Sequence, residues 1–233
     1  PVHVHLEVQS GGAAKVTIDL APDGTVTVNA AGAVSVTAGG AATLTAPSVT
    51  LDTPSTHCTG AVTVDCPLEA GTVILSGNNS FSGAVTINSG ALRITQSSSL
   101  GSGTKSVKIN TGTTGNPQLL LDGSGGAINL PASISYLTSN DANGAIISEA
   151  GNNTIAGPIT MTGGGGNTRV YSHAGTLTLS GPIDSNFAAR TLKLMGAGNG
   201  SVTGVIRNGN PSLMVSVSKE ESGTWTLGGD NSY

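Results

Sequence analysis

Residues 15–66 form a run of short segments in which apolar and polar residues alternate strictly. In the first segment Val16, Ile18 and Leu20 alternate with Thr17 and Asp19. The same pattern continues at Val26, Val28, Val34, Val36, Leu44, Val49, Leu51, Val62 and Val64. A period of two puts alternate side chains on opposite faces of a strand. The breaks between segments, such as PDG, AGG and DTP, have turn chemistry. The pattern therefore predicts short β-strands joined by tight turns.

The spacing of these segments predicts how the strands are partnered. Equivalent apolar positions recur roughly every seven to ten residues, which is too short a period for a coil made of several strands of one chain. A short strand with one apolar face cannot bury that face alone. We therefore expect three identical chains to contribute one strand each per layer, forming a triangular prism with Val, Ile and Leu inside and no free strand edge. A small two-sheet sandwich is the alternative, but it normally needs longer strands and aromatic filling.

Composition narrows the class of protein. The chain of 233 residues has only 9% charged residues and 3% aromatic residues, but 35 glycines. Slightly positive mean hydropathy and a net charge of −4 argue against disorder, which needs low hydrophobicity and high net charge. Nine Lys and Arg residues cannot supply the basic surface that nucleic acid needs, so we expect no nucleic-acid partner. No apolar run approaches the roughly 18 residues that a membrane-spanning helix needs.

After residue 70 the sequence becomes richer in Asn, Gly and Ser. The phrase GTVILSGNNSFSGAVTINSGALRI covers Gly71–Ile94, and GTWTLGGDNSY restarts it at Gly223–Tyr233. Further segments of this kind are Asn153–Gly163, Gly175–Asp184 and Gly200–Gly209. Short apolar strands can stack in register and bury Val, Ile and Leu, while Asn and Gly fit tight corners and Asn side chains can form ladders. The sequence predicts a single-chain parallel β-helix here.

The first part resembles the C-terminal stem of spike proteins from contractile phage tails, the baseplate assembly protein V type. It is also similar to the stems of type VI secretion and pyocin spikes. The segment Val49–Asp65, VTLDTPSTHCTGAVTVD, carries most of this resemblance, which covers residues 1–67. The resemblance implies a homotrimeric intertwined β-helix without an active site, which helps to pierce an outer membrane. It also implies a baseplate hub, a tail tube and a tip protein as partners.

The second part closely resembles the passenger-associated repeat of autotransporters. Its characteristic positions are filled by Leu75, Gly77, Asn79, Phe81, Gly83, Thr86, Ile87, Gly90 and Leu92, and again by Trp225, Leu227, Gly229, Asn231 and Tyr233. This resemblance covers residues 71–233, and the chain ends inside the second copy of the phrase. It implies a right-handed parallel β-helix that is exported and displayed on a bacterial surface.

The two resemblances meet at residues 68–70. Leu68-Glu69 is the dipeptide that a common restriction-site junction encodes, although any protein can contain it by chance. Because it lies between two unrelated β-structures, we expect a fusion, engineered or natural. A natural spike with an elongated tip is the alternative. We therefore expect an all-β chain with a trimeric stem over 1–67, a junction over 68–70 and a β-helical segment over 71–233.

The candidate metal ligands are His3 and His5 in the phrase PVHVHLE. Two residues apart on a strand, both imidazoles point to one face, and a threefold axis would bring six together, enough for an octahedral transition metal. The spike resemblance implies iron at a His-x-His pair, but at the distal tip rather than before the stem. The alternative is an ordinary surface strand. Cys58 and Cys66 are either a disulfide between neighbouring rungs or two small buried side chains, and we favour the second interpretation.

Enzymatic chemistry has little support in the sequence. Between residues 71 and 218 the acidic residues are Asp122, Asp141, Glu149 and Asp184, and they are isolated from one another. Polysaccharide hydrolases need paired carboxylates. Gly163–Asn167 is a glycine-rich loop without the strand and helix of a phosphate-binding site, and His173 has no nucleophile phrase nearby. We therefore expect no enzymatic activity and no certain cofactor.

The sequence favours a structural protein: a cell-puncturing spike stem that carries a β-helical display segment, located on a virion tail, in the extracellular space or on a bacterial surface. The alternative is a surface adhesin module of autotransporter-passenger type, which binds a carbohydrate or a host receptor through loops of the coil. An adhesin should show a conspicuous binding surface, whereas a scaffold need not.

Overall fold

The computed structural model describes residues 4–10, 13–20, 26–30, 48–51, 62–65, 71–110, 116–139, 143–163 and 167–233. The chain divides into two compact units, Pro1–Thr45 and Ala46–Tyr233. His3 and both cysteines lie outside the described residues. Among the described residues, no helix has the length and apolarity needed to cross a membrane.

The first unit contains one small antiparallel sheet. Its strands are β1 (Val4–Ser10), β2 (Ala13–Leu20) and β3 (Val26–Ala30), in the order β1-β2-β3. Val8 pairs with Val16, and Ile18 pairs with Val28. The alternating pattern over residues 15–66 correctly predicted β2 and β3, but we expected these strands to pair with other chains. Alternation decides which face of a strand is apolar and not which chain supplies its neighbour. The trimeric intertwined stem is not shown and stays a prediction.

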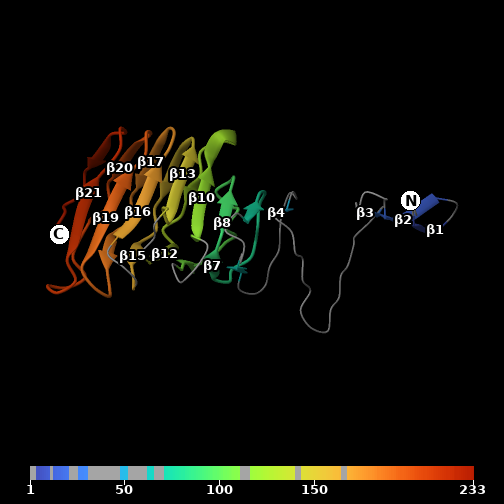
Figure 1. The fold of residues 1–233 in the computed structure, drawn as a ribbon, viewed down its shortest axis with the longest axis horizontal. Helices are drawn as coiled ribbons and strands as arrows, with labels where there is room; N and C mark the ends of the chain where they lie inside the picture. Colours follow the sequence, from blue (N-terminus) through green and yellow to red (C-terminus); the bar gives the residue numbers. More distant parts are fainter. Residues whose placement is uncertain are drawn as a thin grey trace. The chain divides into compact units, whose positions relative to one another are not determined.

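The second unit is a parallel β-solenoid of about six turns in the part that the structure describes (Figure 1). Three sheets form its faces. The eight-stranded sheet consists of β4 (Ser48–Leu51), β6 (Thr72–Leu75), β8 (Ala91–Ile94), β10 (Gln118–Asp122), β13 (Ile146–Ala150), β16 (Asn167–Ser172), β19 (Arg190–Met195) and β21 (Val215–Lys219).

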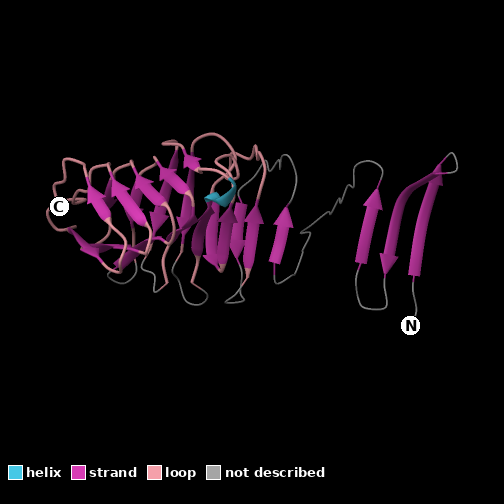
Figure 2. Ribbon diagram, turned by 90° about the horizontal axis from the view of Figure 1, so that it is seen from above, coloured by secondary structure: helices cyan, strands magenta, loops and turns pink. Residues whose placement is uncertain are grey.

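The other two faces have fewer described strands. The six-stranded sheet consists of β5 (Val62–Asp65), β7 (Val85–Ser89), β9 (Lys105–Ile109), β12 (Ile134–Thr138), β15 (Ile159–Met161) and β18 (Ile183–Ser185). The five-stranded sheet consists of β11 (Asn129–Leu130), β14 (Asn152–Ile155), β17 (Thr176–Leu179), β20 (Asn199–Val202) and β22 (Trp225–Leu227). Strands of each face stack along the solenoid (Figure 2). β4 and β5, which lie in the range predicted as stem, pair in parallel with β6 and β7.

One turn of the solenoid takes about two dozen residues. Thr160 and Asp184, which are 24 residues apart, face each other on successive turns. Equivalent inward positions are therefore stacked into apolar columns. One column in the eight-stranded sheet is formed by Leu92, Leu119, Ile146, Val170 and Leu194, all of them buried. Each such side chain contributes roughly 1.5–3 kcal/mol through burial, so the many thin layers replace one thick aromatic core.

Glycines stack at the corner between the five-stranded and six-stranded sheets. A Cβ added to Gly181 would lie 2.2 Å from the carbonyl oxygen of Gly157, and a Cβ on Gly204 would lie 2.0 Å from that of Gly181. The same relation holds between Gly229 and Gly204, at 2.4 Å. Only a residue without a Cβ allows the backbones of successive turns to approach this closely. We call Gly157, Gly181, Gly204 and Gly229 the glycine ladder.

Candidate functional site: a polar cleft beside Asp122

A short protrusion interrupts the regular solenoid at the corner between the eight-stranded and five-stranded sheets. One residue, Gly151, separates β13 from β14, whereas the one-turn 3-10 helix η1 (Gly123–Gly125) and its flanks separate β10 from β11. The Asp122 side chain accepts a hydrogen bond from the Ser124 backbone N–H at 3.2 Å and so starts the turn. The sequence DGSGG supplies a capping carboxylate and small residues, and the chain is pushed outward here (Figure 1).

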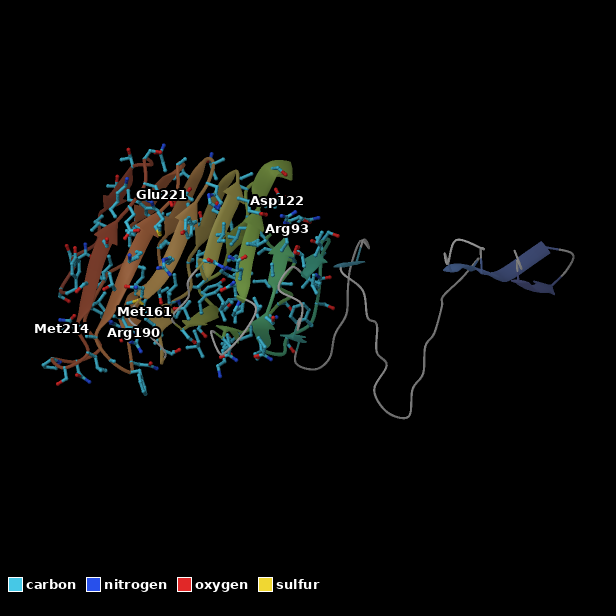
Figure 3. The ribbon with its side chains drawn as sticks, viewed as in Figure 1. Arg93, Asp122, Met161, Arg190, Met214 and Glu221 are labelled. Atoms are coloured by element: carbon cyan, nitrogen blue, oxygen red, sulfur yellow. The ribbon has the colours of Figure 1, made fainter. Side chains whose placement is uncertain are left out.

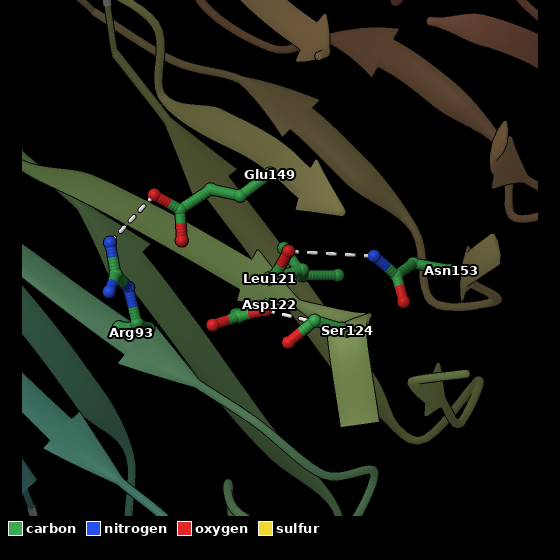
Figure 4. A network of polar contacts seen from close by, with 6 residues as sticks. All are labelled: Arg93, Leu121, Asp122, Ser124, Glu149 and Asn153. Carbon is green, nitrogen blue, oxygen red and sulfur yellow. Dashed lines mark hydrogen bonds and ion pairs between the residues drawn. The ribbon is translucent and has the colours of Figure 1, made fainter. Parts of the chain in front are cut away.

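Asn153 fixes the base of this protrusion. Its Nδ2 donates to Ser148 Oγ at 2.9 Å and to the Ala150 carbonyl at 2.8 Å, and its Oδ1 accepts from the Ile128 backbone N–H at 3.0 Å. Nδ2 also points to the Leu121 carbonyl at 3.5 Å (Figure 4). The side chain is buried, and it joins both ends of the protrusion to the next turn of the solenoid. The protrusion therefore has a rigid base.

A cleft of about 540 Å³ lies between this protrusion and the loop of the preceding turn. Its lining is formed by Thr95, Gln96, Ser97, Ser98, Asp122, Ser124, Gly125, Gly126 and Ala127. The Ser97 hydroxyl oxygen accepts from the Asn129 backbone N–H at 2.8 Å, and the Ser98 hydroxyl donates to Asn78 Oδ1 at 2.5 Å, so both serines have fixed positions. Hydroxyl, amide and carboxylate groups can exchange hydrogen bonds with a hydroxylated ligand.

Arg93 links Asp122 to a second acidic residue. Its Nη2 lies 2.8 Å from Glu149 Oε1, and its positive charge also acts on Asp122. Figure 3 places Arg93 and Asp122 among the side chains of the solenoid, and Figure 4 shows them with Glu149 at this corner. Stacking of the turns thus places Glu149 beside a basic residue that is 56 positions away in the sequence.

Asp184 also has partners, on the six-stranded sheet. Its carboxylate accepts from the Thr160 hydroxyl at 3.0 Å and pairs with Arg207 at 3.2 Å. These contacts are between side chains in neighbouring turns. Both contacts of the Asp184 carboxylate are therefore structural.

The Asp122 carboxyl is ionised over a wider pH range than an ordinary aspartate. A hydrogen bond from the Ser124 side chain lowers the pKa most, and the Ser124 backbone N–H and the positive charge of Arg93 lower it further, against the opposing effect of burial. The cleft thus presents a fixed negative charge and hydrogen-bond acceptors near neutral pH. It suits a ligand that donates hydrogen bonds.

The side chains of both predicted metal ligands, His3 and His5, lie outside the described part of the structure. His3 is outside the described residues, and for His5 the structure describes only the backbone, within β1. Among the residues that are described, no three His, Cys, Asp or Glu side chains lie close enough to hold a metal ion. A transition metal bound by His3 and His5 across a threefold axis stays a prediction. The two interpretations of Cys58 and Cys66 likewise lie outside the described residues.

Comparison with known families supports the second resemblance. The family model of the passenger-associated-transport repeat matches residues 69–94 and 217–233. No curated protein and no solved structure matches the chain. The matched residues lie outside the range 1–67, so the spike-stem interpretation gains no support and stays a prediction.

The two matched segments occupy different faces of one solenoid. Gly71–Phe81 and Gly223–Tyr233 align residue for residue, yet β6 lies in the eight-stranded sheet and β22 in the five-stranded sheet. Phe81 is buried, whereas Tyr233 is 48% exposed. The repeat therefore encodes a strand followed by a corner, the aromatic position is buried in the first copy alone, and the same phrase can serve either face of the solenoid.

Proposed function

We propose that this chain is a structural module of autotransporter-passenger type, displayed on a cell surface or in the extracellular space. The observation that carries the proposal is that the two segments matching the passenger-associated-transport repeat belong to one continuous β-solenoid. A solenoid buries its apolar columns turn by turn, so it can form progressively as the chain emerges. The proposed role is mechanical and binding rather than catalytic.

The cleft beside Asp122 supports an adhesin role within this proposal. It is formed by a protrusion that the neighbouring corner at Gly151 lacks, and its base is fixed by Asn153. Binding sites are often carried by loops on a rigid scaffold. We propose a carbohydrate or a hydroxyl-rich part of a host receptor as the ligand of this cleft.

Surface display can be tested with the full chain placed between an export signal and an autotransporter β-barrel in a Gram-negative host. Antibody labelling of intact cells should detect the chain, and external protease should leave a resistant fragment that contains the solenoid. A matched Gly181→Val variant should reach the surface but lose this resistance, because its side chain would collide with the Gly157 carbonyl. Retention of the unmodified chain inside cells that export another passenger would contradict the proposal.

A further inference from the structure

The outer face of the five-stranded sheet carries two regular columns of small polar side chains. The first column is formed by Asn129, Thr154, Thr178, Ser201 and Thr226, which are paired in register from turn to turn. The second column contains Asn152, Thr176 and Asn199. In the sequence, the columns correspond to the triplets NNT, TLT, NGS and TWT, whose middle residues point inward or lack a side chain.

This face differs from the other two in its charge. All of the outward residues in the two columns are uncharged. The outer face of the eight-stranded sheet carries ion pairs such as Lys193 with Glu220, and that of the six-stranded sheet carries Asp184 with Arg207. The five-stranded sheet therefore presents a neutral polar strip between two charged faces.

The polar groups of the strip are oriented and available. Asn152 Oδ1 accepts from the Thr176 backbone N–H at 3.0 Å, and Asn199 Oδ1 accepts from the Thr224 N–H at 3.2 Å. These bonds hold both amide groups at the surface, and both side chains are exposed. Within the described part of the chain, no hydrogen bond engages the hydroxyl groups of Thr154, Thr178 or Ser201.

We propose that this face binds an uncharged polysaccharide that lies along the solenoid axis. Neighbouring parallel strands are about 4.8 Å apart, and alternate residues of one strand are about 6.6 Å apart. The spacing between strands runs along the solenoid axis, and an extended glycan advances by a similar distance per sugar residue. Each turn can therefore offer the hydroxyl and amide groups of its two columns to one sugar. The absence of charge removes any electrostatic attraction to acidic or basic glycans, and the absence of large apolar groups gives a protein partner no anchor. This inference goes beyond the proposed function by assigning a second binding surface, separate from the cleft beside Asp122, and it rests on that function only in supposing contact with external glycans.

The test uses the purified full chain in affinity electrophoresis through gels containing a neutral mannan, a neutral soluble β-glucan or the anionic glycan alginate. We expect retardation in at least one neutral glycan, independent of salt, and none in alginate. The double variant Thr154→Val/Thr178→Val should weaken retardation at least tenfold, because it removes two hydroxyl groups while retaining side-chain shape. The matched variant Thr86→Val/Thr191→Val, on the other two faces, should bind as the unmodified chain does.

The possible outcomes separate this inference from the proposed function. Loss of binding only in the Thr154/Thr178 variant, with unchanged thermal unfolding, supports the inference. Absence of binding to both neutral glycans, preference for alginate, or equal weakening in both double variants would overturn it. Inhibition of ice recrystallisation without glycan binding would also overturn it, since the array would then order water instead. A chain that is displayed on cells but binds no glycan would disprove the inference and leave the proposed function standing.

Discussion

Thr138 and Thr168 form a hydrogen bond inside the solenoid, with their Oγ1 atoms 3.2 Å apart. Thr138 ends β12 of the six-stranded sheet and Thr168 lies in β16 of the eight-stranded sheet, and their exposed fractions are 0% and 1%. The pair therefore spans the interior between two faces. On folding, each hydroxyl loses its hydrogen bonds to water and gains this hydrogen bond to the other threonine.

Removal of both hydroxyls should lower the free energy of unfolding by less than the two single removals added together. Thr138→Val or Thr168→Val alone leaves a buried hydroxyl without this partner, which should lower the free energy of unfolding by about 1–3 kcal/mol. In the double variant two methyl groups meet, and the loss should be smaller than the sum of the single losses. Urea unfolding of all four proteins gives the coupling energy, and strictly additive losses would show that the hydrogen bond contributes nothing.

The glycine ladder predicts a position at which even a methyl group is costly. In Gly181→Ala the new Cβ would lie 2.2 Å from the Gly157 carbonyl oxygen, so the two turns must separate. We expect a loss of about 1–3 kcal/mol or more in the free energy of unfolding. Gly125→Ala is the matched control, since a Cβ there meets nothing within 4 Å. Equal stability of the two variants would show that close approach of the turns is unimportant.

Much of the solenoid could be predicted from local sequence. In the segment TLTL, Leu177 and Leu179 are buried and Thr176 and Thr178 face outward, as alternation requires. The expected asparagine ladder is confirmed where Asn110 Nδ2 donates to Asn88 Oδ1 at 2.8 Å. These features depend on period and corner chemistry, which a single short segment contains.

Features that depend on the length of a turn could not be predicted in this way. The contact between Arg93 and Glu149 requires knowledge of how many residues each intervening turn contains. The cleft beside Asp122 arises because one corner is longer than its neighbours, and the aligned copies of the repeat fall on different faces for the same reason. A signal for the ladder is present in GPI, GPI and GVI at Gly157, Gly181 and Gly204, but these segments taken singly indicate only further turns of the solenoid.

The acidity of Asp122 should depend on Ser124. The hydrogen bond from the Ser124 side chain lowers the Asp122 pKa most, and Ser124→Ala removes it while keeping the backbone N–H bond, so this variant should raise the pKa toward its ordinary value of 3.8. The Asp122 pKa is lower in the folded chain than its ordinary value of 3.8, which applies to the unfolded chain. Asp122 therefore stabilises the folded chain fully above pH 3.8, and this stabilisation is lost as the pH falls through the folded pKa. Carboxyl NMR titration measures the shift directly. Ser216→Ala, an exposed position in β21, should leave the titration unchanged.

Lys105 should make stability depend on alkaline pH. It is 6% exposed, its Nζ donates to the carbonyls of Phe81 at 2.5 Å and Leu100 at 2.7 Å, and it lies 4.2 Å from the centre of the Phe81 ring. Desolvation lowers the Lys105 pKa in the folded chain below its ordinary value of 10.5. Between the folded pKa and 10.5 the unfolded chain binds more protons than the folded chain, so the contribution of Lys105 to stability rises with pH in this range.

Lys105→Met tests both roles of this side chain. It removes the two hydrogen bonds while keeping an unbranched chain, and should lower the free energy of unfolding at neutral pH by about 1–3 kcal/mol. The difference from the unmodified protein should change with alkaline pH, because Met cannot lose a proton. Urea unfolding at neutral and alkaline pH measures this, with the exposed Lys108→Met as control. A difference that stays constant with pH would contradict the assignment of the pH dependence to Lys105.

The oligomeric state tests the interpretation of residues 1–67. If the alternating segments form a trimeric stem, light scattering of the full chain should give about three times 22.8 kDa. The antiparallel pairing of β1, β2 and β3 within one chain offers these strands partners without a trimer, so the mass of a single chain is the alternative outcome. Val28→Asp separates the two arrangements, because three unpaired carboxylates at a trimer axis would each cost several kcal/mol and abolish association. Thr27→Asp, on the opposite face of the strand, should leave a trimer intact. A mass of one chain in the unmodified protein would exclude the trimeric stem, and a trimer that survives Val28→Asp would exclude Val28 from its axis.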